Sequence, residues 1–313
     1  MARARRDVEM ILKVARMRYD QRQSPSEIAQ SLSISESTVS RVLKAAMDLG
    51  FVEVQVTPSG WRDARLEDEL IARFGLAAAI VVQRRDRAGF FGALPRALAA
   101  DIENRLAPGT ILGVSDGETV AAVASAIRRG RSADIDVVSM IGGMGSSQLN
   151  TYSTEIGRVF AAHIGGRAWQ LPAPAVVEDA KAARALLGMG MVRTVFEKMA
   201  QASIALVGIG AMTPQAAVFS HGMIDSSEIE PITASGAVGS ICARFYNRDG
   251  RPIASAFDDR TIAISLQDLA RLDLRYGAAL GLHKIDAIRA ALRSGLLNAL
   301  GTDVPTASAL LER

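Results

Sequence analysis

Residues 24–50 read SPSEIAQSLSISESTVSRVLKAAMDLG, and their apolar positions have the spacing of two short helices joined by a tight turn. Ser24 and Glu27 stand three residues apart around a proline, which is the signature of a capped helix start. Ser35 follows the turn and is placed to cap a second helix, which ends at Gly50. The stretch therefore predicts a helix-turn-helix, with a plain helical hairpin as the alternative.

The outer face of the second predicted helix carries short polar side chains near its N-terminus and cations further along. Its members are Ser37, Thr38, Ser40, Arg41 and Lys44. They lie opposite the apolar positions Val39 and Val42, so they can face one partner together. Hydroxyls and cations in this order suit the major groove of double-stranded DNA. We expect these residues to bind operator DNA.

The residues around this motif extend it to a winged helix-turn-helix domain at residues 1–56. Upstream, Ile11 and Val14 recur at helical spacing, and residues 51–56 alternate like a short strand or wing. The turn position that such motifs usually fill with glycine holds Ser33. This substitution costs about 1 kcal/mol if the backbone there is left-handed.

The charge of the chain is only mildly basic, at +3 with a pI near 9.2. Affinity for DNA should therefore be local rather than a property of the whole protein. Part of the positive charge lies at the N-terminus, in Arg3, Arg5 and Arg6. This terminus is either simply solvated or placed to follow phosphate or to enter a minor groove.

The numbers and positions of the cysteine, histidine and apolar residues limit the disulfides, metal sites and membrane spans that we expect in this chain. The single cysteine, Cys242, excludes an intramolecular disulfide, and the histidines are widely scattered, at 163, 221 and 283. We therefore expect no metal site and no cofactor. No stretch approaches the roughly 18 uninterrupted apolar residues of a membrane span, and the arginine-rich start has no apolar core after it. The expected location is the cytoplasm, with no membrane partner.

The rest of the chain, residues 57–313, is long enough for a second domain with its own function. Turn-forming residues at 57–61 mark the boundary, and residues 62–74 have the spacing of a helix that either opens this domain or joins two copies of the chain. Beyond it, short apolar runs alternate with helical segments, which predicts an α/β domain with a mostly parallel sheet. The runs are 78–82, 110–114, 135–141, 203–207, 241–245 and 296–300.

Ligands of open α/β sheets gather at the carboxyl ends of the strands, so the loops after the apolar runs are candidate ligand contacts. Glycines there let backbone amides approach a ligand, and a helix N-terminus favours an anion or a hydroxyl. The loops are 113–119, 142–145, 208–210 and 302–303. Each alone is more often a plain turn, but together with Lys284 they predict a small-molecule pocket. The candidate residues are Gly113, Ser115, Asp116, Gly117, Glu118, Thr119, Gly142, Gly143, Lys284, Thr302 and Asp303.

Several stretches carry a family resemblance that runs nearly the whole chain. The strongest are IAQSLSISESTVSRVLKAAMDLGFVEVQV at 28–56, GAVGSICARFYNRDG at 236–250 and GLHKIDAIRAALRSGLLNALGTDVPTASALL at 281–311. Weaker agreement comes from VVSMIGGMG at 137–145, LPAPAVVE at 171–178 and ALVGIG at 205–210. In these stretches the chain resembles the SorC family of sugar-responsive bacterial transcription regulators.

The resemblance implies that the C-terminal domain is folded like ribose-5-phosphate isomerase and glucosamine-6-phosphate deaminase. It implies that this domain senses a sugar or sugar phosphate rather than transforming it. It also implies a homotetramer, in which the bound ligand alters how paired DNA-binding domains reach their operator.

The first of the loops departs from the family pattern in a way that bears on the ligand. Family members commonly have neutral, small or basic residues there, whereas this chain has Asp116 and Glu118. Outside this loop, Leu282 and Ser240 also depart from the family pattern. Two carboxylates repel a phosphate, while their oxygens accept hydrogen bonds from the hydroxyls of a sugar or polyol. Lys284 matches the family's effector-contacting lysine and would pair with these acids or with a phosphate. We favour an unphosphorylated sugar or polyol. A sugar phosphate remains an alternative ligand. In a further alternative, Asp116 and Glu118 both point to solvent and contact no ligand.

The fold implied by the resemblance also hosts enzymes. Asp116 with Glu118, or Asp303 with Lys284, could form the acid–base pair of a sugar-phosphate isomerase or deaminase. Such an enzyme also needs a phosphate cradle, no histidine occurs in the loops, and we interpret His283 as structural. We therefore predict no catalytic residues. The predicted function is transcriptional regulation of carbohydrate or polyol catabolism, with an enzyme that carries a DNA-binding appendage as the alternative.

Overall fold

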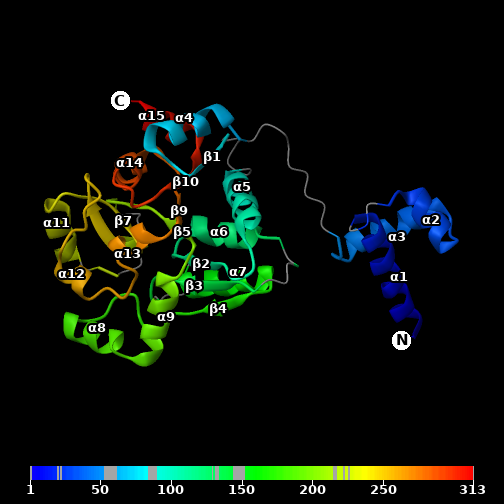
Figure 1. Ribbon diagram of the computed structural model, residues 1–313, viewed down its shortest axis with the longest axis horizontal. Coiled ribbons are helices and arrows are strands. Elements are labelled where there is room, and N and C mark those ends of the chain that lie inside the picture. The colour runs from blue at the N-terminus through cyan, green and yellow to red at the C-terminus, as the bar shows by residue number, and fades with distance from the viewer. Residues whose placement is uncertain are drawn as a thin grey trace. The chain divides into compact units, whose positions relative to one another are not determined.

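The computed structural model describes residues 2–19, 21, 23–52, 62–83, 90–128, 130, 134–143, 152–213, 217–220, 223–224 and 226–312 (Figure 1). The chain forms two compact units, Met1–Ser59 and Gly60–Arg313. The boundary that the sequence predicts at residues 57–61 lies outside the described residues.

Three helices make up the described part of the N-terminal unit: α1 (Ala2–Tyr19), α2 (Pro25–Leu32) and α3 (Glu36–Asp48). They enclose a small apolar core to which every helix contributes. Its buried residues are Val14, Met17, Ile28, Ala29, Val39 and Leu43. The first helix therefore completes the core of the other two, as its apolar spacing predicts.

The predicted caps and turn of the helix-turn-helix are confirmed. Ser24 Oγ accepts from the Glu27 amide at 3.2 Å, and Glu27 Oε2 accepts from the Ser24 amide at 2.7 Å. Ser35 caps α3 by accepting from the amide of the third helical residue. Between the helices, Ser33 is left-handed, with φ 52° and ψ 43°. These local hydrogen bonds fix where each helix begins and how the chain turns between them.

The predicted wing is only partly covered by the structure. Phe51 and Val52 do not belong to a strand, and residues 53–56 lie outside the described residues. The wing therefore stays a prediction.

The second unit is built on a seven-stranded sheet in which all neighbouring strands are parallel, in the order β1-β10-β9-β5-β2-β3-β4. Its strands are β1 (Ala78–Val82), β2 (Ile111–Val114), β3 (Asp136–Ser139), β4 (Arg167–Trp169), β5 (Ile204–Gly208), β9 (Leu274–Ala278) and β10 (Ala299–Asp303). A smaller antiparallel sheet holds β6 (Gly210–Ala211), β7 (Ala237–Ile241) and β8 (Arg244–Asn247). The predicted α/β class is confirmed.

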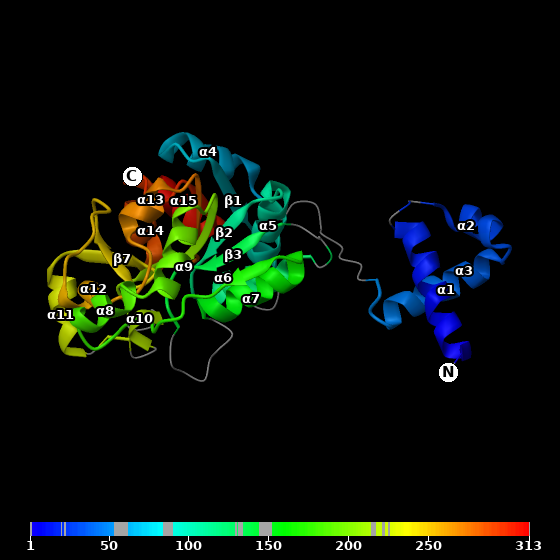
Figure 2. The same ribbon diagram turned by 60° about the horizontal axis from the view of Figure 1, so that its bottom comes forward.

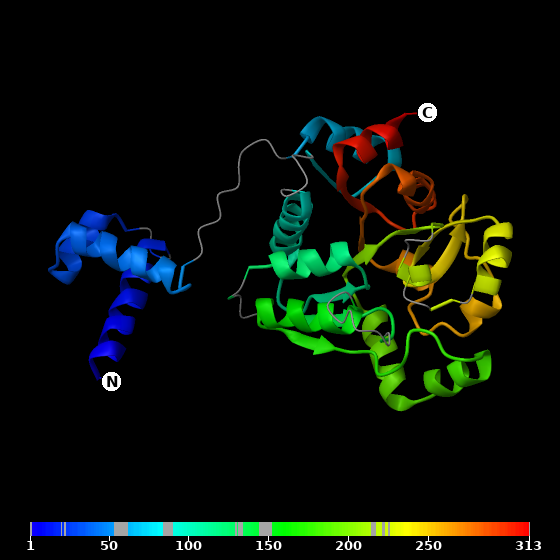
Figure 3. The same ribbon diagram turned by 180° about the vertical axis from the view of Figure 1, so that it is seen from behind.

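Helices cover both faces of the large sheet (Figures 2 and 3). One face is covered by α5 (Phe90–Arg105), α6 (Glu118–Ala126) and α7 (Ser153–Ile164). The other is covered by α4 (Ala64–Phe74), α9 (Gly190–Ala200), α13 (Leu266–Arg271), α14 (Ile285–Arg293) and α15 (Val304–Leu311). Shorter helices are α8 (Ala180–Leu187), α10 (Ala217–Ser220), α11 (Ser226–Ala234), α12 (Ala256–Asp259) and the 3₁₀ helix η2 (Leu282–Lys284). Because both faces are buried, the strands are largely apolar runs.

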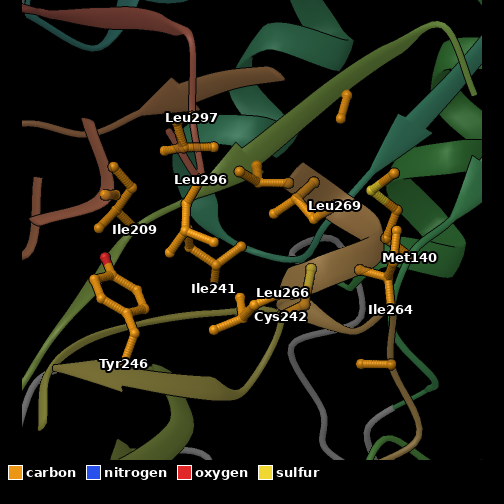
Figure 4. Packing of buried hydrophobic residues seen from close by; sticks show 14 of the residues in the cluster. Met140, Ile209, Ile241, Cys242, Tyr246, Ile264, Leu266, Leu269, Leu296 and Leu297 are labelled. Atoms are coloured by element: carbon orange, nitrogen blue, oxygen red, sulfur yellow. The ribbon is translucent and has the colours of Figure 1, made fainter. Parts of the chain in front are cut away.

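The antiparallel sheet packs against the second of these faces. Ile241 and Tyr246, from β7 and β8, lie in one apolar cluster with Met140 and Leu297 of the large-sheet unit (Figure 4). The Tyr246 hydroxyl also donates to the Ala287 carbonyl of α14 at 3.1 Å. These contacts hold the β7–β8 hairpin against the main body of the unit.

One predicted strand is wrong, because the run 241–245 spans a hairpin turn. Cys242 and Ala243 form the turn between β7 and β8, and both are left-handed, with φ 51° and 58°. Turns of this kind are usually made by glycine or asparagine, so no turn signal is visible in the sequence.

The remaining differences concern strand positions. The run 296–300 begins too early, because Leu296 and Leu297 pack in the core before β10 starts. Strand β4 is short and mostly exposed, and β9 contains Arg275 and Tyr276, so neither stands out as an apolar run. Burial on a sheet is decided by neighbouring strands, which a single run of sequence does not show.

We expect Ser33→Gly to stabilise the N-terminal unit by about 1 kcal/mol, because glycine adopts the left-handed conformation without a steric penalty. The matched control is Ser31→Gly inside α2, which should destabilise the unit, since glycine is a poor helix former. Hydrogen exchange of the α2 and α3 amides, followed by mass spectrometry on the full chain, measures both changes. Unchanged or faster exchange in Ser33→Gly would contradict the strain at Ser33.

Candidate DNA-binding helix and effector site

The outer face of α3 is arranged as the sequence predicts. Ser37, Ser40, Arg41 and Lys44 are exposed, and Thr38 is half-buried. The opposite face of α3 is buried in the core of the unit. The structure thus brings the predicted residues onto one accessible surface, while their contact with DNA remains a prediction.

A chain of hydroxyl groups orients the N-terminal part of this surface. Ser35 Oγ lies 2.8 Å from Ser37 Oγ and 2.9 Å from Thr38 Oγ1. The guanidinium of Arg41 donates to the same Thr38 Oγ1 at 3.2 Å. Thr38 therefore holds the Arg41 side chain in place. The sequence shows the spacing of these residues but not this hydrogen bond.

Ser115, after β2, joins two of the predicted loops. Its hydroxyl accepts from the Gly208 amide of β5 at 2.9 Å and donates to the Asp116 carbonyl at 2.9 Å. The side chain is buried, and its amide donates to the Leu206 carbonyl at 3.1 Å. The structure accounts for Ser115 as a link between β2 and β5.

Close packing explains Gly113, within β2, and Gly142, after β3. A side chain at Gly113 would collide with the thioether of Met140, and a Cβ at Gly142 would lie 2.5 Å from the Pro174 carbonyl oxygen. The Gly142 amide donates to the Ile262 carbonyl at 3.0 Å, and the Gly143 amide donates to the Ala173 carbonyl at 2.8 Å. Both amides are thus used within the protein, and a ligand contact by these glycines rests on their position alone. The neighbouring residues 144–150 lie outside the described residues.

The start of α6 offers groups that the helix itself does not use. Gly117 is its N-cap, with φ 116°, and makes no side-chain cap to the first turn. The first amides of a helix have no partner within it, and here they follow the half-buried Asp116. Glu118 is exposed and Thr119 half-buried. This loop therefore combines amide donors with carboxylate acceptors.

Lys284 brings a third segment to the same place. Its ammonium donates to the Ile209 carbonyl, just after β5, at 2.8 Å. Burial lowers the pKa of Lys284, and the negative charge of Glu118 opposes that change. The loops after β2 and β5 and helix η2 therefore meet around one partly buried cation. Neighbouring His283 is exposed.

The hairpin turn that the sequence hides also lies close to this place. Burial raises the pKa of the Cys242 thiol well above its ordinary value, and the negative charge of Asp116 adds to the effect. Cys242 and Ala243 thus bring the β7–β8 turn near the loop that carries Asp116. Sequence reasoning misses these residues as neighbours of the site.

Thr302 and Asp303, at the end of β10, differ in the hydrogen bonds that their side chains make. Asp303 is buried, and its carboxylate caps α15 by accepting from the Thr306 amide at 3.1 Å. The Thr306 hydroxyl accepts from the Gly281 amide at 2.9 Å, which ties α15 to the loop before Lys284. Thr302 is fully buried, and its hydroxyl has no hydrogen-bond partner among the described residues. Asp303 is therefore accounted for as a helix cap.

Two features of the described residues bear on other classes of function. No group of three or more histidine, cysteine, aspartate or glutamate side chains there could hold a metal ion. In the same part of the chain, no helix is both long and apolar enough to cross a membrane.

Comparisons with known proteins place the chain among regulators. A family model described as "Putative sugar-binding domain" matches residues 61–312. The Deoxyribonucleoside regulator of Bacillus subtilis (strain 168) is 33% identical over 306 residues, with 97% of each chain covered. The Erythritol catabolism regulatory protein of Brucella abortus (strain 2308) is 30% identical over 310 residues, again with 97% of each chain covered. These relatives are regulators rather than enzymes, as we expect of this chain.

A solved structure agrees with these matches. The crystal structure of the full-length sorbitol operon regulator from Klebsiella pneumoniae superposes with a TM-score of 0.79 at 26% identity, covering 98% of this chain and 99% of that chain. The likeness therefore includes both units of the fold.

Removing the Arg41 side chain should weaken binding to operator DNA. If Arg41 reads a base, Arg41→Ala should cost about 1 to 3 kcal/mol on the operator and much less on an unrelated duplex. Thr38→Val should cause a smaller loss of the same kind, because it frees Arg41 from its hydrogen bond. Fluorescence anisotropy at fixed salt, with an operator selected from random-sequence DNA, measures these losses.

Arg73→Ala is the control, because Arg73 is an exposed arginine on α4 of the other unit. It should leave affinity for the operator unchanged. Equal operator affinity for Arg41→Ala and the wild type would contradict the placement of Arg41 on the DNA.

Proposed function

Because the chain belongs to the SorC family of sugar-binding transcriptional regulators, we propose that α3 reads operator DNA and that a small effector controls this reading. The effector binds where the loops after β2 and β5 meet Lys284. The observation that carries this proposal is the partly buried ammonium, which contacts the Ile209 carbonyl and interacts with Glu118. A buried cation among strand-end loops is typical of a ligand site.

The groups around Lys284 favour a ligand rich in hydroxyls. Asp116 and Glu118 supply acceptors, and the first amides of α6 supply donors. A hydroxyl can both donate and accept, so a sugar or polyol satisfies both sets of groups. The carboxylates disfavour a phosphate, and the Lys284 ammonium already donates a hydrogen bond to the Ile209 carbonyl. We therefore favour an unphosphorylated sugar or polyol over a sugar phosphate.

The controlled genes are proposed to serve carbohydrate or polyol catabolism. The names of three similar regulators mention deoxyribonucleosides, erythritol catabolism and a sorbitol operon. A regulator of operator DNA shares a compartment with that DNA, which supports a cytoplasmic location.

The protein is proposed to act as a homo-oligomer, with a tetramer as the form that its family membership favours. A single helix-turn-helix buries too little surface for tight, specific binding, and paired half-sites need a symmetric protein. The second unit, which is much the larger, supplies the surface for self-association.

Asp116→Ala tests the proposed ligand chemistry. If Asp116 accepts hydrogen bonds from ligand hydroxyls, the change should weaken binding of an unphosphorylated sugar or polyol by about 1.5 to 3 kcal/mol. If Asp116 only repels phosphate, the change should instead tighten binding of the matching sugar phosphate. Calorimetric titration measures both, using the best sugar or polyol from a thermal-shift screen and its phosphorylated form.

Asp273→Ala provides the matched control, because Asp273 is exposed beside the first residue of β9, at the opposite edge of the sheet. It should not change either affinity. Tight binding by the wild type that is confined to the phosphorylated compound would overturn the preference for an unphosphorylated effector.

A further inference from the structure

An open groove, here called the α1–α3 groove, lies between α1 and α3 at the edge of the surface that we assign to operator DNA. Its described lining residues are Met10 and Ile11 of α1 and Thr38, Arg41, Val42 and Ala45 of α3. Because these side chains line one hollow, they form a contiguous surface. The residues predicted to bind DNA all belong to α3, so the groove brings a second helix to the same place.

Most of the residues that line the groove are apolar, although the groove is open to solvent. Met10 is 40% exposed, and the other three apolar lining residues are half-buried. The face of α3 that packs in the core of the unit is made by Val39, Leu43 and Ala46 instead. The lining residues are therefore only partly covered within the protomer, which leaves contiguous apolar surface for a partner.

Arg41 lies where the groove meets the DNA-binding surface. Its guanidinium donates to Thr38 Oγ1 at 3.2 Å, and both side chains line the groove. Among the described lining residues, Arg41 is the one charged side chain, and none is acidic. Lys44, three positions further along α3, is exposed and adds a second cation to this surface. An apolar groove with cations at its edge suits a polyanion that carries small apolar groups.

Double-stranded DNA has this chemistry. The 5-methyl group of thymine is the apolar group that base edges present in the major groove, where arginine pairs with O6 and N7 of guanine. Ala45 lies four residues beyond Arg41, which is about 6 Å along the helix, and stacked base pairs are about 3.4 Å apart. With α3 in the major groove, the α1–α3 groove therefore faces a base pair one or two steps from the one that Arg41 contacts.

We propose that the α1–α3 groove receives the 5-methyl group of an operator thymine, so that Met10, Ile11, Val42 and Ala45 determine part of the operator sequence. This inference rests on the proposed reading of operator DNA by α3 and adds α1 to the elements that read it. The methyl group and the apolar lining residues are removed from water together, which supplies the free energy of discrimination.

Replacement of single operator thymines by deoxyuridine tests the proposal, because uracil differs from thymine only in lacking the 5-methyl group. The full chain should bind about fourfold more weakly when one particular thymine in a half-site is replaced, which is the effect of one buried methyl group. Fluorescence anisotropy at fixed salt, with an operator selected from random-sequence DNA, measures the ratio of the two affinities.

Two variants locate this discrimination in the groove. Ala45→Leu fills the groove, so the deoxyuridine operator should bind at least as tightly as the thymine operator. Met10→Gln replaces an apolar wall by an amide at an exposed position, and should reduce the ratio to less than about twofold. Val8→Gln is the matched control, because Val8 is 38% exposed on the same helix and is not among the lining residues. It should keep the ratio of the wild type.

Circular dichroism melts check the fold of each variant, and Met10→Gln decides the test if Ala45→Leu fails to fold. A wild type that binds its operator equally well with every thymine replaced would overturn the proposal, while operator reading by α3 stands. Discrimination that persists in Met10→Gln would place the methyl contact on another surface, and an equal loss in Val8→Gln would also overturn the groove. A wild type that prefers no DNA sequence would overturn operator reading itself.

Discussion

The parallel direction of all seven strands is the constraint on which the second unit depends. Parallel strands need crossover connections, and the helices in these connections cover both faces of the sheet. Every strand then releases its loop at the same edge, so segments far apart in sequence meet there. The loops after β2 and β5 and helix η2 meet at Lys284 for this reason.

The same sheet anchors the first described residues that follow the N-terminal unit. Arg62 bridges to Val82 of β1, and its guanidinium makes two hydrogen bonds to Glu67, at 2.7 and 2.8 Å. Glu67 is buried and also accepts from the Val81 amide at 2.9 Å. Strand β1 pairs with β10, with Val82 opposite Asp303. One strand, β1, therefore separates Arg62, at the start of the second unit, from Asp303 at the carboxyl end of β10.

The helix-turn-helix could be predicted in detail because its signals are local. Caps, turn and buried face all arise from residues within a few positions of one another, including the left-handed Ser33. For the proposed effector site, the sequence indicates only a general position, at the carboxyl ends of the strands. Whether the Ser115 hydroxyl is free for a ligand depends on its partner Gly208, which lies 93 positions away in the sequence. The turn at Cys242 was hidden because its residues lack the usual turn chemistry.

The most direct test of the central claim is the response of operator binding to an effector in the wild type and in Lys284→Met. The measurement is fluorescence anisotropy of a labelled operator, titrated with the unphosphorylated sugar or polyol that most stabilises the wild type. The account predicts that the compound shifts the operator affinity of the wild type. It predicts that Lys284→Met binds the operator equally well without the compound and no longer responds to it. A variant that responds like the wild type would show that the effector acts elsewhere in the protein.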